Sequence, residues 1–127
     1  MEKFIVNGPS SLKGTVCISG AKNAAVAILP ATLLVRGKCH LENVPDISDI
    51  RAYLKILESL GSDITYINKN EFIIDNSNVN TAIASYELTS KFRASYYLLG
   101  SLINNFDDVR ISLPGGCNLG ARPIDQH

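Results

Sequence analysis

Residues 46–75, DISDIRAYLKILESLGSDITYINKNEFIID, decide the fold class because the apolar period changes within them. Before Gly61 the apolar residues recur every three or four positions, which predicts a helix with one buried stripe. Asp46 or Ser48 lies where the N-cap of that helix is expected, and a glycine such as Gly61 typically ends a helix. The stripe comprises Ile50, Leu54, Leu57 and Leu60.

The second half of this stretch changes to the period-two pattern of strands. Residues 63–67 and 71–75 alternate apolar and polar side chains on either side of Asn68, Lys69 and Asn70. Two alternating segments around a short polar turn predict a β-hairpin. A helix followed directly by a hairpin indicates a sheet with helices packed on it.

The residues before this stretch predict a further helix between strands. The helix is expected to be capped by Ser19 or Gly20, and Pro30 is expected to kink or interrupt it. Its expected apolar face comprises Ala24, Ala25, Ile28, Leu29 and Leu33. The alternating segments that predict strands are residues 3–7, 15–19 and 39–42.

After the hairpin, a polar loop at 77–86 leads to an expected third helix over 87–104 and a strand at 109–113. The inward face expected for that helix comprises Leu88, Phe92, Tyr96, Leu99 and Ile103. The whole pattern predicts an α/β fold with helices packed on a mixed sheet. Because the loop from Pro114 leads to no further element, we expect that a larger protein has been cut here.

Composition excludes several classes of protein. Of the 127 residues, 12 are basic and 12 are acidic, so no overall charge draws the chain to nucleic acid or to an anionic membrane. The chain starts without a recognisable leader, and its longest apolar stretch, residues 24–35, is too short to span a bilayer. We therefore expect a cytoplasmic protein without nucleic-acid or membrane partners.

The three cysteines indicate a reducing compartment. They form no CxxC pair and are odd in number, which argues against a disulfide framework or a cysteine zinc site. Cys17 and Cys39 lie in alternating apolar segments and are expected to be small buried side chains. Cys117 differs from them because it lies between glycines and polar residues.

Two glycine-bearing turns carry the candidate chemistry. The first, SGAKNA at 19–24, places Lys22 and Asn23 at a helix N-terminus, where backbone N–H groups and an ammonium favour a phosphate or a carboxylate. The alternative for Lys22 is a solvated surface charge. The second, PGGCNLGARP at 114–123, holds Cys117 near Arg122, a cation that would favour the nucleophilic thiolate. Its alternative is a structural cysteine, and Arg93 could simply extend its guanidinium to solvent.

These segments together carry a family resemblance. SGAKNA at 19–24, KFRAS at 91–95 and LPGGCNLGARPIDQH at 113–127 resemble the signature stretches of the UDP-N-acetylglucosamine 1-carboxyvinyltransferases. NVPDISDI at 43–50 fits the same family, so the resemblance covers essentially the whole chain. It implies transfer of the enolpyruvyl group from phosphoenolpyruvate to the 3-hydroxyl of UDP-N-acetylglucosamine, with release of phosphate.

The resemblance also implies a role for each site residue. Lys22 and Asn23 would hold phosphoenolpyruvate, and Cys117 would donate the proton to its methylene carbon and be the thiol that fosfomycin alkylates. No metal and no cofactor is implied. The residues implied to bind the UDP-sugar are Arg93, Arg122, Pro123, Ile124, Asp125 and Gln126. Gln126 departs from the leucine common in the family.

The fold implied by the resemblance is an inside-out α/β barrel built of β-α-β-α-β-β units, here incomplete. Residues 1–21 would join the other globular domain, and residues 22–127 would form a partial catalytic domain. The chain alone is then expected to be inactive. Two alternatives remain: a non-catalytic fragment that binds the UDP-sugar, and the related shikimate-pathway transferase, which lacks the PGGC loop.

Overall fold

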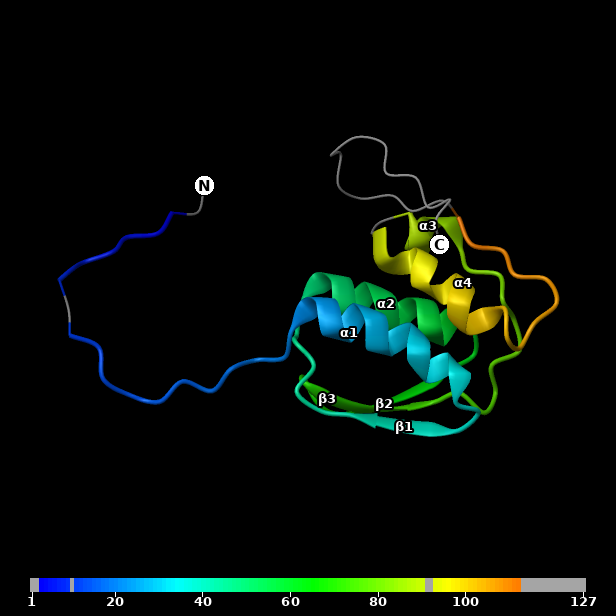
Figure 1. Cartoon of the computed structure of the whole chain (residues 1–127), viewed down its shortest axis with the longest axis horizontal. Coiled ribbons are helices and arrows are strands. Elements are labelled where there is room, and N and C mark those ends of the chain that lie inside the picture. The colour runs from blue at the N-terminus through cyan, green and yellow to red at the C-terminus, as the bar shows by residue number, and fades with distance from the viewer. Residues whose placement is uncertain (1–2, 10, 91–92, 113–127) are drawn as a thin grey trace.

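The computed structural model of the chain describes residues 3–9, 11–90 and 93–112 (Figure 1). An extended amino-terminal segment leads into a body of helices layered on a small sheet. In chain order the elements are α1 (Lys22–Ala31), η1 (Thr32–Leu34), β1 (Lys38–Leu41), α2 (Ser48–Ser59), β2 (Asp63–Asn68), β3 (Glu71–Asp75), α3 (Tyr86–Thr89), η2 (Arg93–Tyr96) and α4 (Tyr97–Leu102).

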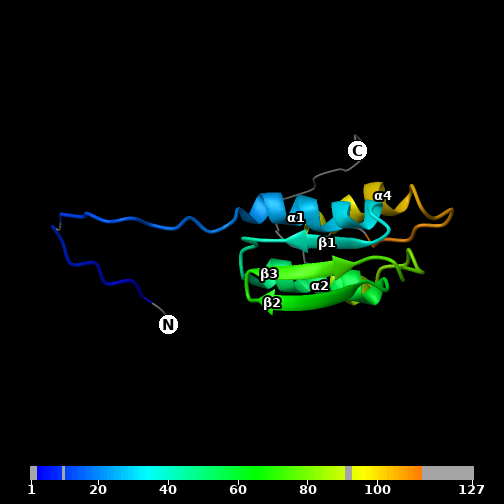
Figure 2. The ribbon, with the colours of Figure 1, turned by 90° about the horizontal axis from the view of Figure 1, so that it is seen from below.

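The strands form a three-stranded antiparallel sheet in the order β1-β3-β2. The expected hairpin is confirmed as β2 and β3, and the expected strand at 39–42 is confirmed as β1. Helices α1 and α2 cover one face of the sheet, and the described residues leave the other face open (Figures 1 and 2). From α1 to β3 the order is helix, strand, helix, strand, strand. This is the order of one expected β-α-β-α-β-β unit without its first strand.

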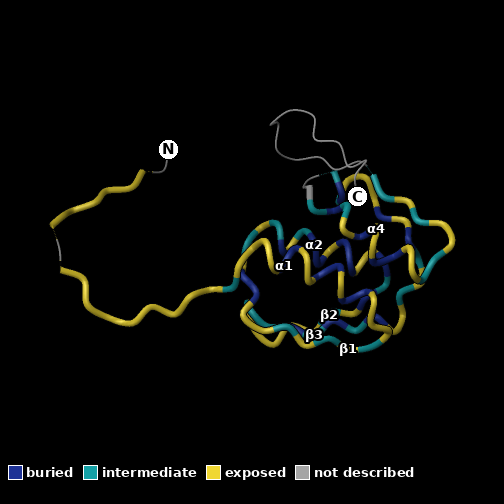
Figure 3. Tube along the Cα trace, viewed as in Figure 1, coloured by how far each residue is buried: buried dark blue, intermediate teal, exposed yellow. Residues whose placement is uncertain are grey.

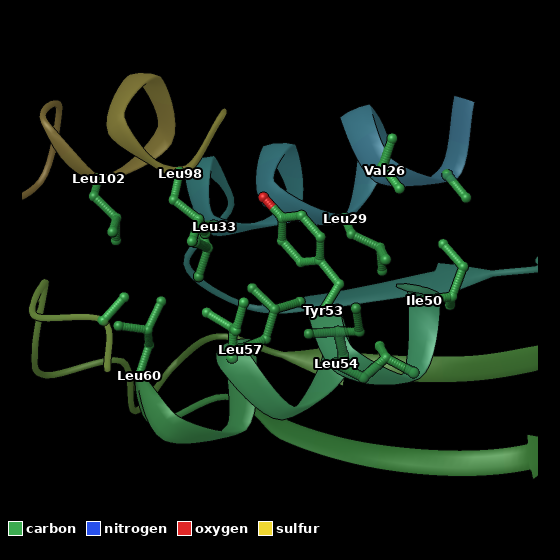
Figure 4. Packing of buried hydrophobic residues seen from close by; sticks show 14 of the residues in the cluster. Val26, Leu29, Leu33, Ile50, Tyr53, Leu54, Leu57, Leu60, Leu98 and Leu102 are labelled. Carbon is green, nitrogen blue, oxygen red and sulfur yellow. The ribbon is translucent and has the colours of Figure 1, made fainter. Parts of the chain in front are cut away.

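Helix α2 provides the centre of the core. The predicted stripe on this helix is confirmed, and Tyr53 and Ile56 are fully buried beside it. Figure 4 shows Tyr53 and Leu57 among side chains from α1 and α4, including Leu29 and Leu98. A fully buried side chain of this size contributes roughly 1.5–3 kcal/mol. Gly61 ends the helix with a φ of 103°, a conformation that glycine adopts without strain.

Helix α1 differs in detail from the expectation. Its N-cap is Ala21, which offers no side-chain hydrogen bond, rather than Ser19 or Gly20. Pro30 lies in the last turn, and the chain continues as the tighter η1 helix, so the expected interruption is mild. The buried face includes Ala25, Leu29 and Leu33 as expected, but Ala24 and Ile28 are exposed.

The prediction of strands at 3–7 and 15–19 is wrong. The described residues before Gly20 form no strand and extend away from the body, exposed along their length (Figure 3). Phe4 is 101% exposed and Leu12 is 93% exposed. A strand needs a neighbouring strand for its backbone hydrogen bonds, and the described part of the chain offers this segment none. Cys17 is exposed in the same segment, so its expected burial is also wrong.

The helix predicted over 87–104 is broken into α3, η2 and α4. Leu88 and Tyr96 are partly buried as expected, but Leu99 and Ile103 are exposed, and Leu98 and Leu102 are buried instead. A 3₁₀ segment turns about 120° per residue instead of about 100°, so η2 shifts the phase by nearly one residue. Phe92, the remaining residue of the predicted face, lies outside the described residues.

The predicted strand at 109–113 is reduced to one isolated parallel bridge between Ile83 and Arg110. Two backbone hydrogen bonds of 3.0 Å, Ala84 N to Arg110 O and Arg110 N to Ala82 O, hold the bridge. Leu113 lies outside the described residues. Within the described part of the chain, no helix has the length and apolar character needed to cross a membrane.

A buried asparagine joins the helical layer to the sheet. Asn76, 3% exposed, donates from Nδ2 to the Thr32 carbonyl at 2.8 Å. Its Oδ1 accepts the Ser62 hydroxyl at 2.7 Å. Because all three groups are buried, none of them can turn to water when a partner is lost.

We therefore expect Asn76→Ala to lower the free energy of unfolding by about 2–3 kcal/mol, because Ser62 and Thr32 lose their buried partner. Urea denaturation measures the change. The matched control is Asn78→Ala, which removes an exposed amide that donates to Asp63 at 3.2 Å. That change should stay within about 0.5 kcal/mol. Equal losses in the two variants would contradict the role assigned to Asn76.

A close backbone crossing fixes where α1 begins. The Gly20 N–H donates to Asn43 Oδ1 at 3.0 Å, and a Cβ on Gly20 would collide with the Asn43 carbonyl oxygen. Asn43 has a φ of 55°, in the left-handed region that asparagine tolerates better than most residues. Lys22, the first residue of α1, follows this crossing by two positions.

Gly20→Ala is accordingly expected to push the chain off Asn43 and to lower the free energy of unfolding by about 1–3 kcal/mol. The amide resonances of Ala21, Lys22 and Asn43 should shift in a ¹H–¹⁵N spectrum. Gly14→Ala is the control, because nothing lies within 4 Å of a Cβ there. An unchanged spectrum and unchanged stability for Gly20→Ala would disprove the tight crossing.

Candidate active site

Lys22 and Asn23 lie together at the start of α1, as predicted. The N-cap Ala21 provides no side-chain acceptor, so the first backbone N–H groups of this ten-residue helix have no cap. Backbone donors at a helix N-terminus attract an anion, and the Lys22 ammonium adds charge beside them.

The Lys22 ammonium already has a counter-ion. Its Nζ forms an ion pair with Asp49 Oδ2, and Asp49 lies in the first turn of α2. The two side chains are 53% and 32% exposed, and a pair this open contributes at most about 1 kcal/mol. A phosphate or carboxylate that arrives at α1 can therefore compete with Asp49 for Lys22.

Asn23 lies at a pocket that a distant segment completes. The pocket holds about 190 Å³ and is lined by Asn23, Val26, Ala94, Tyr96 and Tyr97. Ala94 directly follows Arg93, the residue predicted to bind the UDP-sugar. The fold therefore brings Asn23 next to the segment that contains Arg93. Packing of α1 against α4 creates this proximity.

The tyrosines of this pocket were not predicted as site residues. The rings of Tyr96 and Tyr97 lie tilted against each other with centroids 4.6 Å apart. Aromatic faces stack on planar or apolar parts of a ligand, and an asparagine amide can donate and accept hydrogen bonds. The only signal in the sequence is the pair of tyrosines after Arg93, which periodicity alone assigns to a helix face.

The remaining predicted site residues cannot be placed against this pocket. Arg93 begins η2, but its side chain lies outside the described part of the structure. Cys117, the predicted reactive thiol, also lies outside the described residues. So do the other residues predicted to bind the UDP-sugar, Arg122, Pro123, Ile124, Asp125 and Gln126.

Cys39 does not offer an alternative nucleophile. It is partly buried on the inner face of β1, and desolvation raises the pKa of its thiol. A raised pKa keeps the group protonated near neutral pH, and the thiolate is the nucleophilic form. Its expected character as a packed side chain agrees with this environment.

Comparisons with known proteins agree with the motifs. Residues 6–127 match the family described as EPSP synthase (3-phosphoshikimate 1-carboxyvinyltransferase). The chain is 49% identical over 127 residues to UDP-N-acetylglucosamine 1-carboxyvinyltransferase 3 of Caldanaerobacter subterraneus subsp. tengcongensis, covering all of this chain and 30% of that protein. It is 48% identical over 128 residues to the UDP-N-acetylglucosamine 1-carboxyvinyltransferase of Clostridium botulinum, covering all of this chain and 31% of that protein.

A solved structure gives the same result for the fold. The enolpyruvyl transferase NikO from Streptomyces tendae superposes with a TM-score of 0.64 and 28% identity, over 74% of this chain and 22% of NikO. The chain thus spans about 30% of the length of the curated relatives that it matches. The family match covers nearly the whole chain, and the resemblance stated from the motifs is confirmed. The chain belongs to the EPSP synthase family of enolpyruvyl (1-carboxyvinyl) transferases.

Proposed function

We propose that the full-length protein transfers the enolpyruvyl group of phosphoenolpyruvate to the 3-hydroxyl of UDP-N-acetylglucosamine and releases phosphate. This chain would be its amino-terminal part. The observation that carries the proposal is the 44–49% identity, over the whole chain, to proteins named UDP-N-acetylglucosamine 1-carboxyvinyltransferase. The product is a precursor of peptidoglycan, so we also propose a cytoplasmic enzyme of cell-wall synthesis with small-molecule partners and no cofactor.

The arrangement at α1 supports a site for two anionic substrates. In our proposal Lys22, released from Asp49, binds phosphoenolpyruvate together with Asn23 at the helix N-terminus. Arg93 and the run from Arg122 to Gln126 bind the UDP-sugar, where the paired donors of arginine suit phosphate oxygens. The nearby cations offset the repulsion between the two substrates.

Cys117 is the proposed acid of the reaction. Its thiol gives a proton to the methylene carbon of phosphoenolpyruvate, and positive charge develops at the neighbouring carbon. The sugar hydroxyl attacks that carbon and forms the new C–O bond, while a base takes the hydroxyl proton. Loss of a proton from the methyl group then expels phosphate and restores the double bond. The base would come from the part of the protein that this chain does not include.

The division into domains is part of the proposal. Residues 1–21 would belong with the other globular domain of the full-length protein, and residues 22–127 would form part of the domain that carries Cys117. The described residues before Gly20 support this division because they pack on nothing in the body (Figure 1).

We expect the full-length protein to release phosphate from phosphoenolpyruvate only when UDP-N-acetylglucosamine is present. Cys117→Ala should lower the rate by at least about a hundredfold, the scale of general acid catalysis. Cys39→Ala is the matched control, because Cys39 is a partly buried side chain of β1 whose thiol pKa is raised, and it should keep the rate. Phosphate release that requires shikimate 3-phosphate instead of the UDP-sugar would favour the shikimate-pathway alternative.

For the 127-residue chain alone, we expect no phosphate release with both substrates, because it supplies only part of the site. Turnover that Cys117→Ala abolishes would disprove this expectation. Thermal unfolding with UDP-N-acetylglucosamine tests the binding alternative, since a ligand that binds only the folded state raises the melting temperature. A rise that Arg93→Ala removes would support a retained binding surface for the UDP-sugar, and no rise at millimolar ligand would exclude it.

A further inference from the structure

Three side chains that could bind a metal gather on the open face of the sheet. His40 lies in β1, Glu42 follows this strand, and Glu71 begins β3. The register pairs His40 with Ile73 and Leu41 with Phe72, which places Glu42 opposite Glu71. Side chains alternate between the two faces of a sheet, so all three point away from the helices.

The spacing of the three side chains allows them to bind one metal ion together. One ligand atom of each residue lies within 4.8 Å of the others, and His40 Nε2 is 2.9 Å from Glu71 Oε1. Imidazole and carboxylate ligands lie about 2.0–2.2 Å from a zinc ion, and hence roughly 3–4 Å from one another. His40 and Glu42 are exposed, so small side-chain rotations bring the three atoms to that spacing.

Glu71 is already oriented for this role. Asn68 Nδ2 donates to Glu71 Oε2 at 2.7 Å, which leaves Oε1 directed at His40. In metal sites, neighbouring groups regularly form a hydrogen bond with the atom of a metal-binding side chain that does not contact the metal. Such hydrogen bonds orient the side chain and strengthen metal binding. The backbone beneath is the paired β1–β3 ladder, so the ligands stand on a rigid support.

The charges of the cluster favour a cation. Like charges directly opposite each other on neighbouring strands destabilise a sheet, and Glu42 and Glu71 are such a pair. Among the described residues, Glu71 forms an ion pair only with His40, and Glu42 forms none. A divalent ion would offset both carboxylates.

We propose that His40, Glu42 and Glu71 form a binding site for a divalent transition-metal ion, for which zinc is the probe. A nitrogen ligand favours such an ion over magnesium or calcium, which prefer oxygen ligands only. The three ligands are a histidine and two glutamates, so the site needs no cysteine. It lies on the sheet face opposite α1, away from Lys22 and Asn23, and does not depend on the proposed transfer reaction.

Zinc calorimetry on the 127-residue chain tests the site, in a background of Cys17→Ser, Cys39→Ala and Cys117→Ser that removes competing thiols. We expect one saturable zinc ion per chain. Amide shifts in ¹H–¹⁵N spectra should centre on residues 40–42 and 68–71. His40→Ala and Glu42→Gln should each weaken zinc binding by at least about tenfold, and Asn68→Ala by about tenfold through Glu71.

The matched control is Glu87→Gln, which removes an exposed carboxylate on α3 and should leave the affinity unchanged. Magnesium at the same concentration should produce no shifts at residues 40–42. The proposal is overturned if millimolar zinc gives no saturable binding, if His40→Ala binds zinc as tightly as the background, or if the shifts centre elsewhere. Circular dichroism of each variant verifies the fold, and rescue by His40→Asp would keep the test valid if His40→Ala unfolded.

Discussion

Burial of helix α2 between the sheet and the other helices is the constraint on which the remaining structure depends. Tyr53, Ile56 and Leu57 have no exposed surface, so α2 needs apolar partners on more than one side. The sheet supplies Phe72 and Ile74 on one side, and α1 and α4 cover the other (Figure 4). Side chains packed at this density tolerate little displacement, so the positions of α1 and α4 follow from the position of α2.

The candidate active site is a consequence of that packing. The start of α1 carries Lys22 and Asn23, and its contact with α2 brings Asp49 to the Lys22 ammonium. Its contact with α4 brings the segment after Arg93 to Asn23. Two segments far apart in the sequence therefore meet because α1, which carries the first, packs directly against α4, which follows the second. The close crossing of Gly20 over Asn43 fixes the point where the chain enters this arrangement.

The sequence predicted well the elements whose partners are close along the chain. The stripe of α2 and the hairpin around Asn68 depend on neighbours within a few residues, so periodicity and turn residues suffice. The phase of α4 was missed because the 3₁₀ turn at η2 depends on tertiary packing and leaves no trace in the apolar period. The pairing of Lys22 with Asp49 joins two helix starts, and no local rule predicts it. The role of Cys117 was inferred from its motif alone, and its position relative to Lys22 and Asn23 stays a prediction.

The wrong prediction of strands before Gly20 has a different cause. The alternation of Phe4 to Val6 and of Val16 to Ile18 is a genuine strand pattern, but a strand also requires a sheet edge to pair with. Within the described residues these side chains stay in water, and the apolar side chains of Ile28 and Leu34 are also about half exposed on and just after α1. Alternation alone therefore does not decide whether a segment forms a strand, because the backbone hydrogen bonds of a strand need a partner edge. The chain spans about 30% of the length of its curated relatives, and the described residues contain no partner strand for the alternating segments before Gly20.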